Sequence, residues 1–138
     1  MSEKLSKYLY EHEYRCRHCD NYPPSFDKDD IAFPFQVLFN AFDDIRERWG
    51  KPIYVSSGYR CPMHNAFSRG SALSAHMWGL ALDLSCDEDE VLYLVELIED
   101  NYPDLRRGKY DWGVHIDVAY FIYPKASAYW VEGRRWYE

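Results

Sequence analysis

Two histidines and an aspartate in this chain have the residue types and the spacing that suit metal chemistry. His76 and Asp83 lie seven positions apart, and Gly79 between them permits a bend that can bring both side chains to one point. His115 follows further along the chain, in a run of alternating character. Two imidazoles and a carboxylate suit zinc, and three protein ligands leave the fourth tetrahedral position open to water. Water bound there can attack a carbonyl near neutral pH, so these residues predict a zinc hydrolase.

Two helices that could support such a site are visible in the sequence. Residues 34–49 predict a helix, because apolar residues recur there at helical spacing and Gly50 follows as a natural C-cap. Residues 87–101 predict a second helix, which begins with a capping box made by Asp87 and Glu90. In both helices the apolar residues form one face, which we expect to be buried.

Two runs of β type provide the other elements. Residues 52–57 form a short run, and residues 113–119 alternate, so that His115 and Asp117 point to one face and apolar residues to the other. A strand of this kind holds a metal ligand more rigidly than a loop does. We expect a single domain over residues 1–138, of the α+β class, with helices packed on one face of a small antiparallel sheet.

Composition and charge exclude several classes of partner. The net charge of −7 leaves no basic stripe for nucleic acid or for an anionic membrane surface. No apolar run approaches the roughly 20 residues of a membrane span. The N-terminal residues lack the apolar segment of a signal peptide, so we expect synthesis in the cytoplasm and, for any export, another route.

The four cysteines allow more than one interpretation. Cys16 and Cys19 have the two-residue gap of half a zinc-binding knuckle, but Cys61 and Cys86 lie too far apart to form the other half. Free thiols are therefore the expectation. A disulfide, or a zinc held by all four cysteines, is the minority interpretation.

Three motifs resemble the zinc D-alanyl-D-alanine peptidase family. They are VSSGYRCPMHN at residues 55–65, SAHMWGLALD at 74–83 and VHIDV at 114–118. This family includes D-alanyl-D-alanine carboxypeptidases, peptidoglycan endopeptidases and many phage endolysins, and the short variant that ends in a Val-His-Ile-Asp strand looks most similar. The resemblance implies a fold of the hedgehog/DD-peptidase type. It also implies a monomer that acts on stem peptides of the bacterial cell wall, which it would reach through a lysis or export system.

The resemblance also assigns roles to individual residues. It implies that His76, Asp83 and His115 are the ligands of a Zn²⁺ ion. It places Arg60 near the reacting carbonyl or the substrate carboxylate, where a planar guanidinium can pair with two oxygens; a structural salt bridge is the alternative role. Ser74 is expected to brace the substrate site by hydrogen bonding.

The general base is the point at which this chain departs from better-known members. They have a carboxylate three residues before the last histidine ligand, whereas this chain has Trp112. Asp111, one place earlier, is the first candidate for the base, and Asp117 is the second, although Asp117 could equally orient His115. This departure keeps a rival interpretation open, in which the scaffold is an inactive zinc-bearing binding or structural module, for example in a phage tail or a sensor.

Overall fold

The computed structural model describes residues 2–68, 74–122 and 130–131 of the chain. Its centre is one sheet with the strand order β1-β2-β4-β3-β5. The first four strands in this order are antiparallel, and the short β5 joins β3 in parallel. The strands are β1 (Tyr54–Ser57), β2 (Ala81–Ser85), β3 (Arg106–Tyr110), β4 (Gly113–Asp117) and β5 (Trp130–Val131).

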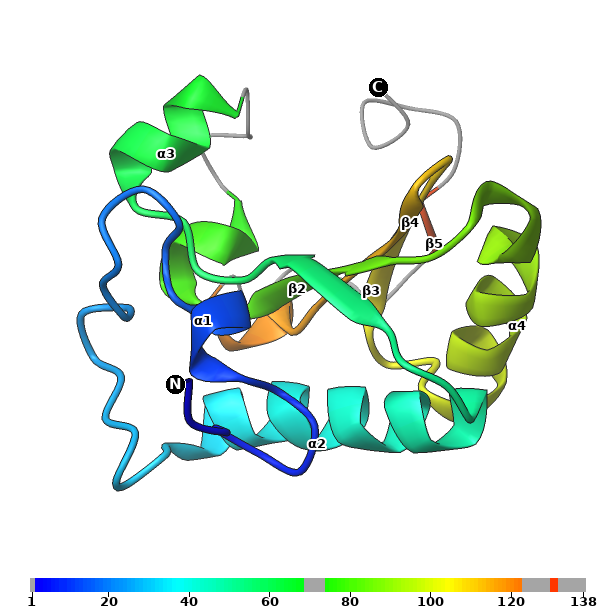
Figure 1. Ribbon diagram of the computed structural model, residues 1–138, viewed down its shortest axis with the longest axis horizontal. Coiled ribbons are helices and arrows are strands. Elements are labelled where there is room, and N and C mark those ends of the chain that lie inside the picture. The colour runs from blue at the N-terminus through cyan, green and yellow to red at the C-terminus, as the bar shows by residue number, and fades with distance from the viewer. Residues whose placement is uncertain (1, 69–73, 123–129, 132–138) are drawn as a thin grey trace.

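Four α-helices and three 3₁₀ turns accompany the sheet in the described residues (Figure 1). The α-helices are α1 (Glu11–Tyr14), α2 (Phe33–Trp49), α3 (Pro62–Phe67) and α4 (Val91–Asn101). The 3₁₀ turns are η1 (Ala75–Trp78), η2 (Glu88–Glu90) and η3 (Ala119–Phe121). The architecture confirms the expected α+β class.

The first predicted helix is confirmed as α2. It ends at Gly50, whose φ of 79° lies in the left-handed region and whose N–H donates to the Arg46 carbonyl, as a glycine C-cap does. Its inner face buries apolar residues, and full burial of one such side chain contributes about 1.5–3 kcal/mol. The buried residues of α2 are Phe35, Leu38, Phe39, Ala41, Phe42 and Ile45.

The second predicted helix begins later than expected. The α-helix α4 starts at Val91 and is preceded by the 3₁₀ turn η2, and the predicted capping box is wrong because the Asp87 side chain caps no backbone N–H. The Glu90 side chain, which would complete such a box, pairs with Lys51 instead. The Glu90 carboxylate is thus engaged by an ammonium group from outside the helix.

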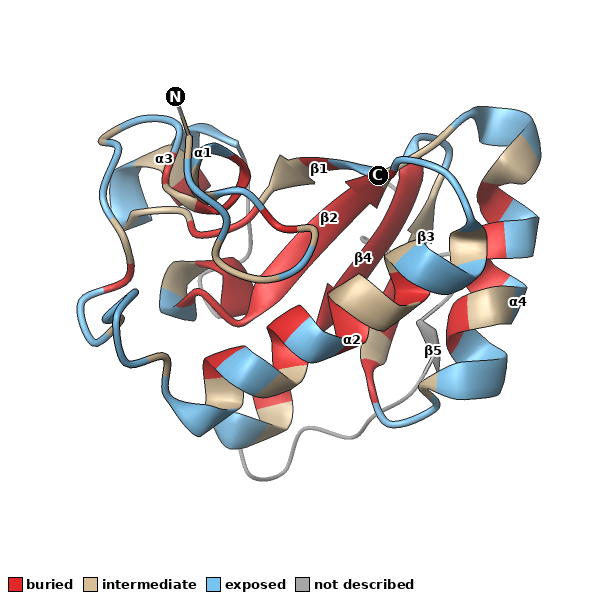
Figure 2. Ribbon diagram, turned by 60° about the horizontal axis from the view of Figure 1, so that its bottom comes forward, coloured by how far each residue is buried: buried red, intermediate tan, exposed pale blue. Residues whose placement is uncertain are grey.

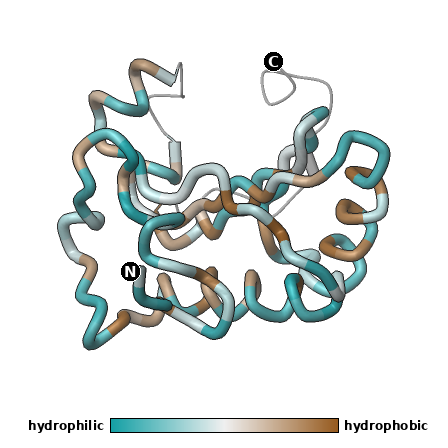
Figure 3. Tube along the Cα trace, in the orientation of Figure 1, coloured by the Kyte–Doolittle hydropathy of each residue, from teal (hydrophilic) through white to brown (hydrophobic). Residues whose placement is uncertain are grey.

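The core lies between the sheet and the two long helices. Figure 2 shows β2 and β4 buried along their length, with α2 and α4 turning buried faces inward and exposed faces outward. Hydrophobic residues recur at intervals along both helices, with hydrophilic ones between them (Figure 3). On β2, Leu82 and Leu84 join this core, whereas Asp83 belongs to the opposite face of the sheet.

A hydrophobic face and a polar face thus alternate along the central strands. On β4 the core-facing residues are Val114 and Ile116, as predicted, and His115 and Asp117 lie on the other face. That second face carries the candidate site. Within the described ranges, no helix combines the length and the apolar character needed to cross a membrane.

Candidate metal centre

Strand register brings two of the three predicted ligands together. Asp83 on β2 pairs directly with His115 on β4, so their side chains lie side by side on the same face. In the same row, Asp83 also pairs with Ser57 of β1, and His115 pairs with Gly108 of β3. The ligand row therefore crosses four strands, which makes it a rigid platform.

A tight turn positions the third predicted ligand. His76 lies in η1, which ends at Gly79 with a φ of 73°, in the left-handed region that favours glycine. A β-carbon at Gly79 would come within 2.3 Å of the Tyr14 hydroxyl oxygen, and this hydroxyl donates to the Gly79 carbonyl over 2.7 Å. The bend predicted between His76 and Asp83 is thus present, and the N-terminal helix locks it in place.

Hydrogen bonds fix the ring nitrogen that each histidine presents. His76 Nδ1 lies 2.6 Å from the Gly58 carbonyl oxygen, which can only accept, so Nδ1 carries the proton. His115 Nε2 lies 2.7 Å from Asp117 Oδ2 and donates to it by the same reasoning. The remaining nitrogens, His76 Nε2 and His115 Nδ1, lie 3.1 and 3.0 Å from Asp83 Oδ1.

This geometry fits a bound cation. In the neutral tautomers, two imidazole lone pairs converge on a carboxylate oxygen, and the three donor atoms lie within 4.8 Å of one another. Neighbouring ligands of a tetrahedral zinc are separated by about 3.4 Å, a few tenths of an ångström more than the separations from Asp83 Oδ1. In each ring, the N–H on the far side from Asp83 donates to a carbonyl or carboxylate oxygen. Hydrogen bonds of this kind usually orient histidines that bind a metal.

The electrostatics of the cluster also favour positive charge. Burial opposes ionisation of Asp83, but His76 and His115 hold the pKa of this carboxyl well below its usual range. Burial would lower the pKa of His115, but hydrogen bonds to Asp117 and Asp83 raise it to about 9. Burial lowers the pKa of His76 and keeps that ring neutral. A proton or a metal ion can satisfy the site, and the neutral, buried His76 suits a metal.

Arg60 lies at the edge of this cluster. Its Nη2 is 3.5 Å from Asp83 Oδ2, its Nε donates to Ser57 Oγ over 3.2 Å, and its Nη1 approaches Asn65 Oδ1 at 3.4 Å. Only 12% of its side chain is exposed, and burial lowers the pKa of the guanidinium. The group remains a cation beside the ligands.

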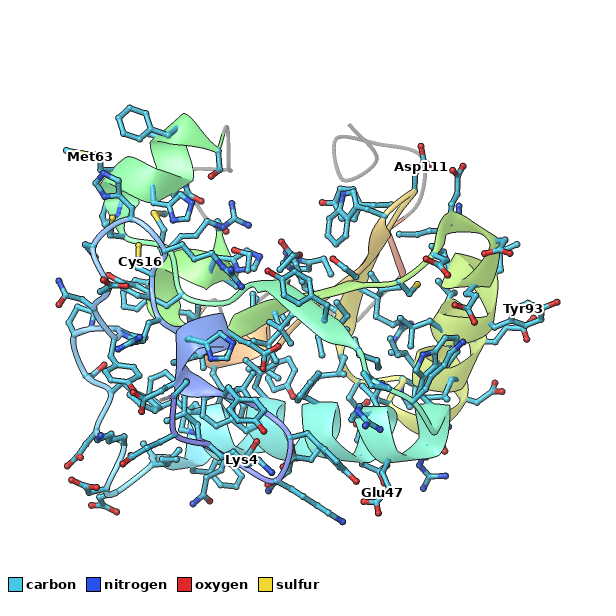
Figure 4. The ribbon with its side chains drawn as sticks, in the orientation of Figure 1. Lys4, Cys16, Glu47, Met63, Tyr93 and Asp111 are labelled. Carbon is cyan, nitrogen blue, oxygen red and sulfur yellow. The ribbon has the colours of Figure 1, made fainter. Side chains whose placement is uncertain are left out.

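The other predicted site residues, Ser74, Asp117 and Asp111, lie at different distances from the predicted ligands and make different contacts. The Ser74 hydroxyl accepts the N–H of His76 over 3.2 Å and so caps the turn that holds this ligand. Asp117 is fully buried; besides His115, it accepts the N–H of Ala119 over 2.9 Å. Asp111 is exposed in the turn between β3 and β4, at the tip of the hairpin (Figure 4).

Some contributors to the site were missed by sequence reasoning. The Gly58 carbonyl sets the tautomer of His76, and Asn65 is a buried partner of Arg60, but neither has a signal in side-chain type. Trp112 stacks on Tyr110 with ring centroids 4.5 Å apart, so the residue at the expected base position forms an aromatic pair. These contacts depend on how the loops and helices beside the strands pack, which the sequence motifs do not show.

Comparison with known proteins agrees with this geometry. The chain matches the family model of Peptidase M15 over residues 8–118, and it belongs to that family. Membership confirms the resemblance to zinc D-alanyl-D-alanine peptidases and implies a peptidase, and peptidases of this family depend on zinc. No curated protein matches the chain.

Proposed function

We propose that this chain is a zinc-dependent peptidase that hydrolyses stem peptides of bacterial peptidoglycan, as a D-alanyl-D-alanine carboxypeptidase or as an endopeptidase. Membership of Peptidase M15 supports a peptidase that acts on peptidoglycan. The observation that carries the proposal is the convergence of His76 Nε2, His115 Nδ1 and Asp83 Oδ1, with both ring tautomers set by acceptors on the far side.

The residues around this centre suit peptide hydrolysis. Zinc held by His76, Asp83 and His115 would act as a Lewis acid toward the scissile carbonyl and as an activator of water. The Arg60 guanidinium lies beside Asp83 at the edge of the ligand set. From there it can hold a substrate carboxylate with two parallel hydrogen bonds, or stabilise the charge that develops on the carbonyl oxygen.

Proton transfer needs a carboxylate, and the two candidates have different surroundings. We assign the general base to Asp111, whose exposed carboxylate is not committed to a partner in the ligand set. Both oxygens of Asp117 already accept hydrogen bonds, from His115 and from the Ala119 backbone. This supports a positioning role for Asp117, which holds the His115 ring in its ligand tautomer.

One observation favours a second candidate function. Trp112 occupies the position of the usual base and stacks on Tyr110, and Asp111 lies exposed at the hairpin tip. If Asp111 does not reach the attacking water, the scaffold would bind wall peptides without cutting them, as an inactive zinc-bearing module. The two functions differ in one measurable property, which is turnover.

Incubation of the zinc-loaded protein with purified muropeptides, followed by mass spectrometry, tests the proposal. A carboxypeptidase removes a terminal alanine from pentapeptide stems, whereas an endopeptidase separates cross-linked dimers into monomers. The double variant His76→Ala, His115→Ala is the control and should leave both substrates intact. Intact substrates with the zinc-loaded wild type would contradict the peptidase and favour the binding module.

A further inference from the structure

We propose that the protein holds a second, structural zinc ion through Cys16, Cys19, Cys61 and His64. This cluster joins the segment after α1 to the start of α3. The sulfur atoms of the three cysteines lie within 4.8 Å of one another, and all four cysteines of the chain are free of disulfides. In Figure 4, Cys16 and neighbouring sulfur atoms gather below α3, away from the hairpin tip that carries Asp111.

The fourth ligand lies beside the sulfur of Cys16. His64 Nδ1 lies 3.5 Å from Cys16 Sγ. Two ligands of a tetrahedral zinc, one sulfur and one nitrogen, are separated by about 3.6 Å, given typical Zn–S and Zn–N bond lengths. The thiolates and the imidazole make a Cys₃His set, which is one of the common closed sets of structural zinc sites.

The sequence spacing has the form of two paired knuckles. Cys16 and Cys19 make a C-x-x-C half, and Cys61 with His64 makes a C-x-x-H half. If cysteines alone are considered, Cys61 can be paired only with Cys86, and these two residues do not form the second half of a zinc knuckle. Cys86 lies directly after β2 and is not a member of the converging group of cysteines. The fold thus supplies the half-site that cysteine counting misses.

Backbone N–H groups point at the sulfurs, as they do around metal thiolates. The Cys61 N–H donates to Cys16 Sγ over 3.4 Å, and the His64 N–H donates to Cys61 Sγ over 3.4 Å. These donors favour the thiolate, which is the form of cysteine that binds a metal ion.

Such a zinc would brace the segment that serves the candidate metal centre. Cys61 directly follows Arg60, whose N–H donates to the His76 carbonyl over 3.0 Å. The N–H of Tyr59 donates to the carbonyl of Tyr14, at the end of α1 close to Cys16. The thiolate zinc would tie these two stretches together, and would thereby hold Arg60 and the Gly58 carbonyl in place.

His18 is a second histidine near the cysteine cluster, and it is the alternative to His64 as the fourth ligand. His18 Nδ1 lies 3.7 Å from Cys61 Sγ, but His18 is exposed, whereas His64 is half-buried and faces the buried Cys16. We therefore assign the closing position to His64. The matched pair of variants His64→Ala and His18→Ala distinguishes the two rings.

Metal counting on the full chain tests the proposal. We expect about two zinc ions per wild-type chain, one in Cys16→Ser and Cys61→Ser, and two in the control Cys86→Ser. His64→Ala should lower zinc affinity at this site strongly, while His18→Ala should retain both ions. Zinc content that is the same in Cys16→Ser, Cys61→Ser and wild type would overturn the site. Zinc loss in His18→Ala with full retention in His64→Ala would overturn the assignment of His64.

Cobalt substitution of the wild type keeps the test decisive if a cysteine variant fails to fold. Cobalt bound by thiolates absorbs in the near ultraviolet through sulfur-to-metal charge transfer, whereas cobalt bound only by imidazole and carboxylate does not. We expect this band in the wild type and, undiminished, in the double variant His76→Ala, His115→Ala. A cobalt-loaded wild type without the band would overturn the proposal. Neither outcome depends on peptidase activity.

Discussion

The two clusters of metal-binding side chains in this molecule differ in what holds them. His76, Asp83 and His115 lie on or beside the central strands β2 and β4, and each imidazole is fixed by an acceptor behind it. The cysteine cluster lies in the segments around α1 and α3, and hydrogen bonds from the local backbone fix its sulfurs. One cluster is supported by the sheet, and the other joins loops that the sheet does not reach.

This difference indicates different chemistry. Zinc held by His76, Asp83 and His115 would keep one coordination position open, beside the cationic side chain of Arg60, which suits the binding and activation of a substrate. Three thiolates and an imidazole close the coordination shell, so that zinc there contributes to folding and not to catalysis. Removal of either metal should therefore have a distinct consequence.

The largest effect is expected from loss of the ligands on the sheet. The double variant His76→Ala, His115→Ala should lose all hydrolysis of stem peptides and one of two zinc ions, because a single carboxylate cannot hold the metal. Elemental analysis and a muropeptide assay measure both changes. Retention of the thiolate-bound zinc serves as the control for folding. Full retention of both ions would show that these histidines are not ligands.

The next largest effect concerns the proton acceptor. Asp111→Asn should reduce kcat by about 10²–10⁴-fold, the usual contribution of a general base, and should leave both zinc ions bound. Asp100→Asn, at an exposed position on α4, is the control for loss of one negative charge. A rate for Asp111→Asn equal to that of the control would exclude Asp111 as the base.

Variants of Arg60 test whether the sheet cluster, formed by His76, Asp83 and His115, recognises a substrate oxygen on its open side. Arg60→Lys should lower kcat/KM by about 10²–10³-fold, almost as much as Arg60→Ala, because an ammonium group cannot form two parallel hydrogen bonds. Zinc content should not change in either variant. Steady-state kinetics on a stem peptide measure the effect. Wild-type kinetics in the lysine variant would mean that Arg60 supplies only positive charge or structure.

A smaller effect is expected at the positioning residue behind the metal. Asp117→Asn should weaken zinc binding at the sheet cluster by about 10–100-fold, because a neutral amide orients His115 less firmly than a carboxylate. Competition with a chelator measures this affinity, and binding at the thiolate cluster is the internal control. If the variant binds zinc fully but loses turnover, the roles of Asp111 and Asp117 must be exchanged.

The sequence predicted the parts of this molecule that have a periodic or motif signal. Helix α2 and the alternation of β4 follow from apolar spacing, and the motifs predicted that His76, Asp83 and His115 would lie together, as they do. Strand β2 was not predicted, although residues 82–85 alternate between apolar and polar, because a run this short is a weak signal.

Contacts between distant segments could not be predicted in the same way. The approach of Cys16 to His64 depends on the packing of α1 against β1. The spacing of the cysteines in the sequence does not indicate this packing. The Glu90–Lys51 pair, which replaced the predicted capping box, joins two segments that meet only in the fold. Sequence reasoning is thus strongest where the ligands lie on regular elements and weakest where they lie in loops.

The most direct test of the central claim is the rate of stem-peptide hydrolysis as zinc is returned to the metal-free protein. The wild type should be inactive without metal and should gain activity as the His76, Asp83 and His115 site fills. The double variant His76→Ala, His115→Ala should take up zinc at its thiolate cluster and remain inactive throughout. Equal hydrolysis by the two proteins, or none by the fully loaded wild type, would contradict the account.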